Sequence, residues 1–322
     1  MLKVNLFGSA RARYADHPLA GFPNQQPSLL LCYLLLNRGR TLPRERLAAV
    51  FWGEYPTPVS LKYLRNCIWR MRKRLVSAGI PIDAYLSISD GGVSFQRSGH
   101  YWLDVEAFET QLTPYHSLPG EILTPEQAAQ LGKAVDLYSG DLLEGVYEDW
   151  CLCDRERLRL AYLEALDKLM AFHEARGEYE QGLACGERIL AHDNIRESVH
   201  RQMMRLYWLQ GDRAAALAQY KRCAQVLREA LGIQPMDDTT QLYQQIAHDH
   251  FQPAVLCEAP LTWSVAPDSS QELAAEYILQ RVHHLQAVVE NARAELGAIE
   301  PLLRDALLHG RSPQLPPAKR AD

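Results

Sequence analysis

The stretch between Pro58 and Ala78 constrains the fold of this chain more than any other feature. It contains no glycine, proline or acidic residue, and six of its residues are cationic. Its apolar residues recur at alternating spacings of three and four, which places them along one face of an α-helix. They are Leu61, Leu64, Ile68, Met71 and Leu75. The pattern therefore predicts an amphipathic helix over 58–77 that is buried on its apolar side.

The opposite side of this helix is cationic and aromatic. At helical spacing it carries Lys62, Arg65, Asn66, Trp69, Arg70 and Lys73. Like charges three and four residues apart on a helix repel one another. A function in binding a polyanion explains why they are tolerated, because a helix fits the DNA major groove and arginine and lysine neutralise phosphates. The alternative is a solvated basic face, which the absence of any interspersed acidic residue disfavours.

Charge is also distributed unevenly along the 322 residues. The first hundred residues hold 14 Lys/Arg and 5 Asp/Glu, whereas the whole chain has a net charge of −5. A basic N-terminal third therefore precedes an acidic remainder. This asymmetry is typical of a nucleic-acid-binding module joined to a body with another role.

The basic third reads as a small α+β module. Alternating apolar residues predict a strand over Leu2–Leu6, and a second short strand is expected near Arg11–Tyr14. Helices are expected over 28–37, capped by Ser28, and over 43–52. Residues 85–96 read as a β-hairpin with a glycine-containing turn. Three helices followed by a hairpin is the order of a winged helix-turn-helix.

Several motifs carry a more specific resemblance. Residues 68–75 (IWRMRKRL) resemble the end of the recognition helix of OmpR-type winged-helix regulators, and residues 37–54 resemble the helix before it. Residues 140–150, 155–159 and 227–235 resemble SARP-type activators, in which this head precedes a bacterial transcriptional activator domain (BTAD). The resemblance covers about residues 1–248.

The resemblance implies a sequence-specific transcriptional regulator, an activator that binds double-stranded DNA at direct repeats and contacts RNA polymerase. The residues matching DNA-contacting positions are Arg65, Asn66, Trp69, Arg70 and Lys73, with Lys62, Arg72 and Arg74 on phosphates. One departure concerns the hairpin, where the family often carries an arginine near the tip for the minor groove. Ser94 stands there in this chain, and Arg97 is the nearest substitute.

The middle of the chain has an internal repeat. Residues 177–184 (GEYEQGLA) recur as 211–218 (GDRAAALA) at an offset of 34 residues, the period of tetratricopeptide (TPR) repeats. Gly182 and Ala216 occupy the position at which two helices approach closely. Flanking helices are expected at about 125–138, 155–176 and 237–250. The resulting stack has a groove for a peptide, a partner helix or a ligand; otherwise it serves as a spacer and homodimer surface.

The fold class expected is therefore mostly α, with four parts and a tail. They are a winged-helix DNA-binding domain (1–100), a TPR-like activator domain (101–250), a proline-bracketed linker (251–270), a C-terminal helical extension (271–310) and a disordered tail (311–322). Apolar residues from Ala275 to Ile299 alternate at spacings of three and four. This extension reads either as a coiled coil or as a helix packed against the repeats.

Signals for other functions are weak. The sequence has no phosphate-binding loop, dinucleotide fingerprint or HExxH motif, so we expect neither catalysis nor a cofactor. Cys151 and Cys153 form the one close cysteine pair, and we expect them to be buried rather than to bind metal. The longest apolar run has eight residues and no signal-peptide core is present, so we expect a cytoplasmic protein without membrane contact.

Two other functions stay open. In the first, the repeats bind a nucleotide or metabolite that gates DNA binding, and the residues for such an anionic effector are Asp154, Arg155, Arg157, Arg159, Arg188 and Arg222. In the second, the chain is an interaction adaptor whose head no longer binds DNA.

Overall fold

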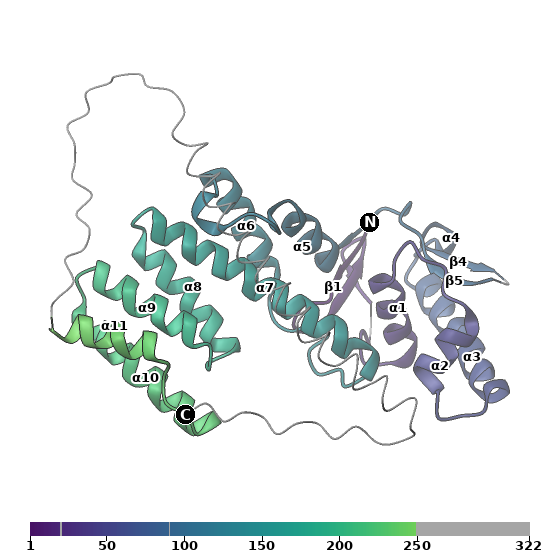
Figure 1. The fold of residues 1–322 in the computed structure, drawn as a ribbon. Helices are drawn as coiled ribbons and strands as arrows, with labels where there is room; N and C mark the ends of the chain where they lie inside the picture. The colour runs from purple at the N-terminus through teal and green to yellow at the C-terminus, as the bar shows by residue number, and fades with distance from the viewer. Residues whose placement is uncertain (20, 90, 249–322) are drawn as a thin grey trace, which may run out of the picture. The chain divides into compact units, whose positions relative to one another are not determined.

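The computed structural model describes residues 1–19, 21–89 and 91–248, all of which fall in one compact unit. The described residues are mostly helical, with strands confined to the first 103 residues (Figure 1). This confirms the expected mostly-α class. The linker, the C-terminal extension and the tail expected over 251–322 lie outside the described residues.

A four-stranded sheet opens the fold. Its strands are β1 (Leu2–Asn5), β2 (Arg11–Tyr14), β3 (His17–Pro18) and β6 (Tyr101–Leu103), in the order β3-β2-β1-β6. β1 pairs antiparallel with β2 and parallel with β6. The side chains of Leu2 and Val4 are buried while Lys3 and Asn5 are half-buried, which is the alternation expected of a sheet with one face on the core. Both predicted strands are therefore present.

Helices and a hairpin follow the sheet. They are α1 (Gln26–Leu36), α2 (Arg44–Trp52), α3 (Thr57–Ser77), the short α4 (Ile82–Tyr85), and the antiparallel pair β4 (Leu86–Ser89) and β5 (Gly92–Phe95). Ser28 does not cap α1 as expected. The helix begins two residues earlier at Gln26, and Ser28 is buried inside it, because Pro27 is compatible with the first turn of a helix.

The remaining elements of the described residues are helices. They are α5 (Asp104–Leu112), the 3₁₀ turns η1 (Thr113–Tyr115) and η2 (Gly120–Ile122), α6 (Pro125–Leu137), α7 (Asp149–Ala175), α8 (Tyr179–His192), α9 (Glu197–Leu209), α10 (Arg213–Leu231) and α11 (Asp237–His248). From α7 onward each helix packs against the next. α7 begins at Asp149, six residues before the predicted start at 155. No helix of the described residues is both long and apolar enough to cross a bilayer.

The two repeated segments adopt the same local structure. Gly177 and Gly211 both take left-handed backbone angles, with φ of 73° and 89°, between the end of one helix and the start of the next. This conformation is accessible to glycine at little energetic cost. A Cβ on Gly182 would lie 3.0 Å from a methyl of Leu206, and Ala216 is fully buried. Gly182 therefore lies at a close helix contact, as predicted, and Ala216 is buried at the corresponding position of the second repeat.

The strand β6 completes the first sheet and leads directly into α5. The Asp104 carboxylate accepts hydrogen bonds from the backbone N–H groups of Leu6 (2.8 Å), Phe7 (3.0 Å) and Val105 (2.8 Å). The ring of Phe7 packs edge-on against Phe108. The first hundred residues are thus joined to α5 by a strand pairing, a buried carboxylate and an aromatic contact.

Candidate nucleic-acid interface

The helix α3 is held by its apolar face. Leu64, Ile68, Met71 and Leu75 are buried, and Leu61 is half-buried. The helix packs against α1 and α2. Burial of this stripe, worth about 1.5–3 kcal/mol for each fully buried large side chain, determines which side of α3 faces solvent.

The opposite side of α3 carries the predicted DNA-binding residues. Seven of the eight are exposed: Lys62, Arg65, Asn66, Trp69, Arg70, Arg72 and Lys73. Within the described parts of the chain, the five arginine and lysine residues of this set form no ion pair. Up to residue 248, the acidic part of the chain therefore leaves this cationic surface uncovered.

Trp69 and Arg74 differ from their neighbours on α3. The Trp69 side chain is 61% exposed, and the Lys73 ammonium lies 5.2 Å from the centre of its ring, within reach of a cation–π contact. Arg74 is half-buried and donates a hydrogen bond to the side chain of Gln25. Arg74 therefore lies at the margin of the exposed surface and is oriented by the segment before α1.

The hairpin has a cation beside its turn that the sequence does not indicate. Arg44, in the first turn of α2, donates from Nη2 to the carbonyl oxygen of Ser89 at 3.1 Å. Ser94 pairs with Ser87 along the hairpin, whereas Arg97 follows the end of β5 away from the turn. Arg97 is therefore not at the turn, and Arg44 is. The contact joins residues 45 positions apart, so no local pattern signals it.

The arginines suggested for an anionic effector are not gathered in one site. Arg155 donates to the backbone oxygens of Leu142, Leu143 and Val146 at 2.7–3.0 Å, so it holds the loop before α7. The others have separate partners: Arg157 contacts Asp154 and Glu109, Arg159 contacts Glu156, Arg188 contacts Tyr162 and Asp136, and Arg222 contacts Glu187.

The expectation for the cysteine pair holds for one member only. Cys151 is buried and burial raises the pKa of its thiol, whereas Cys153 is exposed. The two lie two positions apart on α7 and so point to different sides of the helix. No group of three or more histidine, cysteine or acidic side chains that could hold a metal ion occurs among the described residues.

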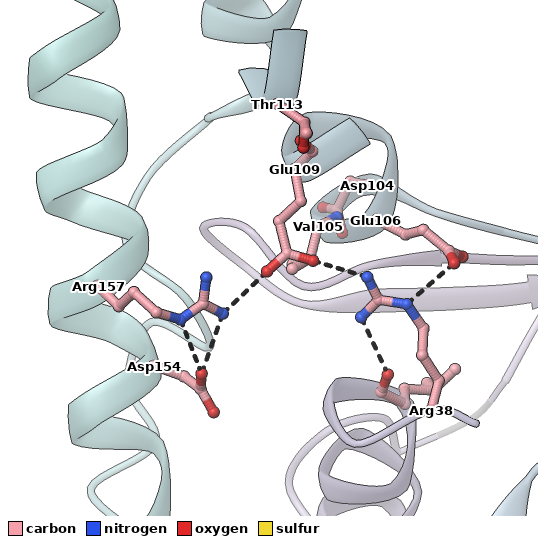
Figure 2. A network of polar contacts seen from close by, with 9 residues as sticks. Arg38, Asp104, Val105, Glu106, Glu109, Thr113, Asp154 and Arg157 are labelled. Atoms are coloured by element: carbon pink, nitrogen blue, oxygen red, sulfur yellow. Dashed lines mark hydrogen bonds and ion pairs between the residues drawn. The ribbon is translucent and has the colours of Figure 1, made fainter. Parts of the chain in front are cut away.

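An ion-pair network links the turn after α1 to α5 and α7 (Figure 2). Arg38 contacts Glu106 at 3.0 Å and Glu109 at 2.6 Å, and Glu109 also contacts Arg157 at 2.9 Å. Burial alone lowers the pKa of Arg38, but the hydrogen bonds to Glu109 and Glu106 raise it above its ordinary value. Arg38 therefore stays charged in a partly buried position.

Residues 103–247, from the last residue of β6 to α11, match the family model of the bacterial transcriptional activator domain. These residues are therefore similar to a BTAD. This match confirms the resemblance to SARP/BTAD-type regulators, and the matched residues include both α5 and the helices from α7 to α11.

Several named relatives match about three quarters of the chain. The regulatory protein AfsR of Streptomyces coelicolor is 26% identical over 246 residues, which are 76% of this chain and 24% of AfsR. The transcriptional regulatory protein EmbR of Mycobacterium tuberculosis is 26% identical over 258 residues, 76% of this chain and 63% of EmbR. The transcriptional regulatory protein MoaR1 of the same species is 23% identical over 235 residues, which are 70% of this chain and 72% of MoaR1. The chain therefore spans about a quarter of AfsR and less than two thirds of EmbR.

A solved structure shares the fold. The structure of M. tuberculosis EmbR in complex with a low affinity phosphopeptide has a TM-score of 0.63 and 20% sequence identity, covering 88% of this chain and 71% of that one.

Proposed function

We propose that this chain is a DNA-binding transcriptional regulator, an activator, that inserts α3 into the major groove of duplex DNA. One observation carries the proposal. The long helix α3 buries its apolar face and leaves seven of the eight predicted contact residues exposed, with no acidic partner among the described residues.

The arrangement around α3 supports this proposal. The order α1, α2, α3 and the β4–β5 hairpin is that of a winged helix-turn-helix, whose last helix reads base edges in the major groove. The exposed Arg65, Asn66, Trp69 and Arg70 are the groups assigned to bases. Lys62, Arg72, Lys73 and Arg74 are assigned to phosphates, which supply most of the affinity. Arg44 beside the hairpin turn is an additional phosphate or minor-groove contact.

The helical body has the assembly role in this proposal. The consecutive packing of α7 to α11 and the matching glycine turns at a 34-residue offset support a TPR-like stack. This stack would contact RNA polymerase or a second copy of the chain. The proposal requires neither a cofactor nor a catalytic step, and the relatives are named as regulatory proteins.

The experiment begins with selection of bound duplexes from a random DNA pool by the full chain. Mobility-shift titrations on a selected site then compare Arg70→Ala, Lys73→Ala and the control Arg228→Ala, which removes an exposed arginine of α10. Arg70→Ala should weaken binding by about 1–3 kcal/mol at the selected site if Arg70 contacts a base. Lys73→Ala should weaken all sequences alike, and Arg228→Ala should change nothing.

Unchanged binding by both α3 variants would refute the assigned face. If the full chain binds no duplex even at low salt, the adaptor function with a degenerate head replaces the proposal.

A further inference from the structure

A pocket lies between α5, η1 and α7, away from α3. Its volume is about 320 Å³. Of its apolar lining residues, Leu112, Tyr115 and Ala161 are half-buried, and Phe108, Leu131, Leu158 and Ala165 are buried. This volume is at the lower end of those that hold small organic ligands. An apolar wall of this kind excludes water from a ligand's hydrocarbon part, so the pocket suits a compact apolar molecule.

The sequence of α7 explains why the pocket is hollow. Leu158, Ala161 and Ala165 follow one another at spacings of three and four, so they share a face of the helix. The two alanines leave room that a leucine would fill. Arg157 lies at one end of this stripe and Lys168 at the other, about 16 Å apart along the helix axis.

The two ends of the pocket differ in the hydrogen-bond donors that they offer. The Lys168 ammonium donates to the carbonyl oxygens of Tyr115 and His116, both at 2.6 Å, and contacts Glu164 at 3.0 Å. Its three N–H donors are thereby matched by three acceptors. The Lys168 end is therefore closed to an additional anion.

Arg157 at the other end keeps donors available. Its Nε and Nη2 contact Asp154, and Nη2 also contacts Glu109. Its Nη1 makes no hydrogen bond with any described residue, and Figure 2 shows this atom pointing away from Asp154. The Arg157 side chain is 53% exposed, so a ligand can reach it. Guanidinium N–H groups pair best with a carboxylate or phosphate.

We propose that this pocket binds a small organic acid, with its apolar body against Leu112, Tyr115 and Ala161 and its carboxylate on Nη1 of Arg157. The pocket is part of the helical body, so the proposal does not depend on DNA binding by α3. A bound acid would also act on the head. Its carboxylate would lie on the same guanidinium as Glu109 and add a second negative charge beside it, and Glu109 is the residue that Arg157 shares with Arg38.

Calorimetric titration of the full chain with 4-phenylbutyrate tests the site. The uncharged 4-phenylbutanamide and the cationic 4-phenylbutylamine have the same apolar body and report on the charge preference. We expect saturable binding of the acid, at least tenfold weaker binding of the amide, and weaker binding still of the amine.

Variants locate the binding site. Arg157→Gln should abolish the difference between acid and amide, and Ala161→Phe should weaken both at least tenfold by filling the pocket. The matched control is Arg159→Gln, which removes an arginine of the same helix that pairs with Glu156 outside the pocket; it should leave the titration unchanged. Thermal unfolding of each variant confirms that it is folded.

Three results would overturn the proposal. They are no saturable binding of 4-phenylbutyrate by the unaltered chain, tighter binding of the amine than of the acid, and equal effects of Arg157→Gln and Arg159→Gln. None of these results bears on the DNA titrations, which can succeed or fail independently.

Discussion

Arg38 and Glu109 join the DNA-binding half of the proposed regulator to its helical half. The Arg38 guanidinium donates to the Glu109 carboxylate at 2.6 Å, and the Arg38 side chain is only 10% exposed (Figure 2). Because Glu106 contacts the same guanidinium at 3.0 Å, one cation at the end of α1 holds two carboxylates of α5. The turn between α1 and α2 is therefore fixed to the body by charge as well as by packing.

The first prediction concerns this contact. Arg38→Gln should lower the free energy of unfolding by about 3 kcal/mol, because it removes the cation from two partly buried carboxylates, of which Glu109 keeps its contact with Arg157. Arg40→Gln removes an exposed arginine of the same turn and should change stability by no more than about 0.5 kcal/mol. Urea unfolding followed by circular dichroism measures both. Equal stability of the two variants would show that the network contributes nothing.

The contrast between α3 and this network shows what the sequence could and could not reveal. The helix α3 was predicted to within one residue at its start, because its apolar residues repeat locally and their spacing alone places them on one face. Arg38 and Glu109 are 71 positions apart, and neither lies in a pattern that points to the other. Contacts of this kind depend on the packing of whole elements, which no local periodicity encodes.

The helical body also contains features that the sequence predicts and features that it does not. The 34-residue repeat predicted close helix contacts at 182 and 216, because such contacts restrict side-chain size. The contact is present at Gly182, and Ala216 is buried. The helix α5 and the strand β6 were not predicted, since β6 has only three residues and pairs with a strand about a hundred positions earlier. The exposure of Cys153 was likewise missed, because it depends on which side of α7 the body covers.

A second prediction tests the two faces of α3 without using DNA. Met71 is 2% exposed and Trp69 is 61% exposed, although only two positions separate them. Met71→Ala should destabilise the chain by about 2–5 kcal/mol, while Trp69→Ala should alter stability by no more than about 0.5 kcal/mol. Denaturant titrations of both variants provide the comparison. A larger loss for Trp69→Ala would reverse the assignment of the faces.

A third prediction concerns the salt dependence of DNA binding. Each phosphate contact contributes about 0.9 to the slope of log affinity against log salt for duplex DNA. Lys73→Ala should therefore reduce the magnitude of this slope by about 1, and Arg228→Ala on α10 should leave it unchanged. Mobility shifts at salt concentrations between roughly 50 and 200 mM, where the affinity for duplex DNA falls steeply with salt, provide the slopes. An unaltered slope for Lys73→Ala would remove Lys73 from the phosphate contacts.

The last prediction rests on a buried histidine of α9. His200 is 1% exposed, and its Nε2 lies 2.9 Å from the carbonyl oxygen of Asn194. That oxygen can only accept, so Nε2 carries the proton and Nδ1 accepts from the side-chain amide of Gln219 at 2.8 Å. If Nδ1 were protonated, its N–H would face the side-chain N–H of Gln219, so two donors would meet in a buried position without an acceptor. Burial, reinforced by the nearby charge of Arg222, lowers the pKa of His200 below its ordinary value of 6.5, although Asn194 opposes the shift.

The consequence for stability has a definite sign. A histidine whose pKa is lower in the folded chain binds fewer protons there than in the unfolded chain, so its contribution is complete above pH 6.5 and declines as the pH falls below that value. The free energy of unfolding should therefore be smaller at pH 5.5 than at pH 7.5, a window centred on the ordinary histidine pKa of about 6.5. His200→Gln removes the titrating group and should flatten this dependence, even if it lowers stability throughout. Urea unfolding of both proteins at the two pH values makes the comparison, and an equally steep dependence in the variant would assign it to other groups.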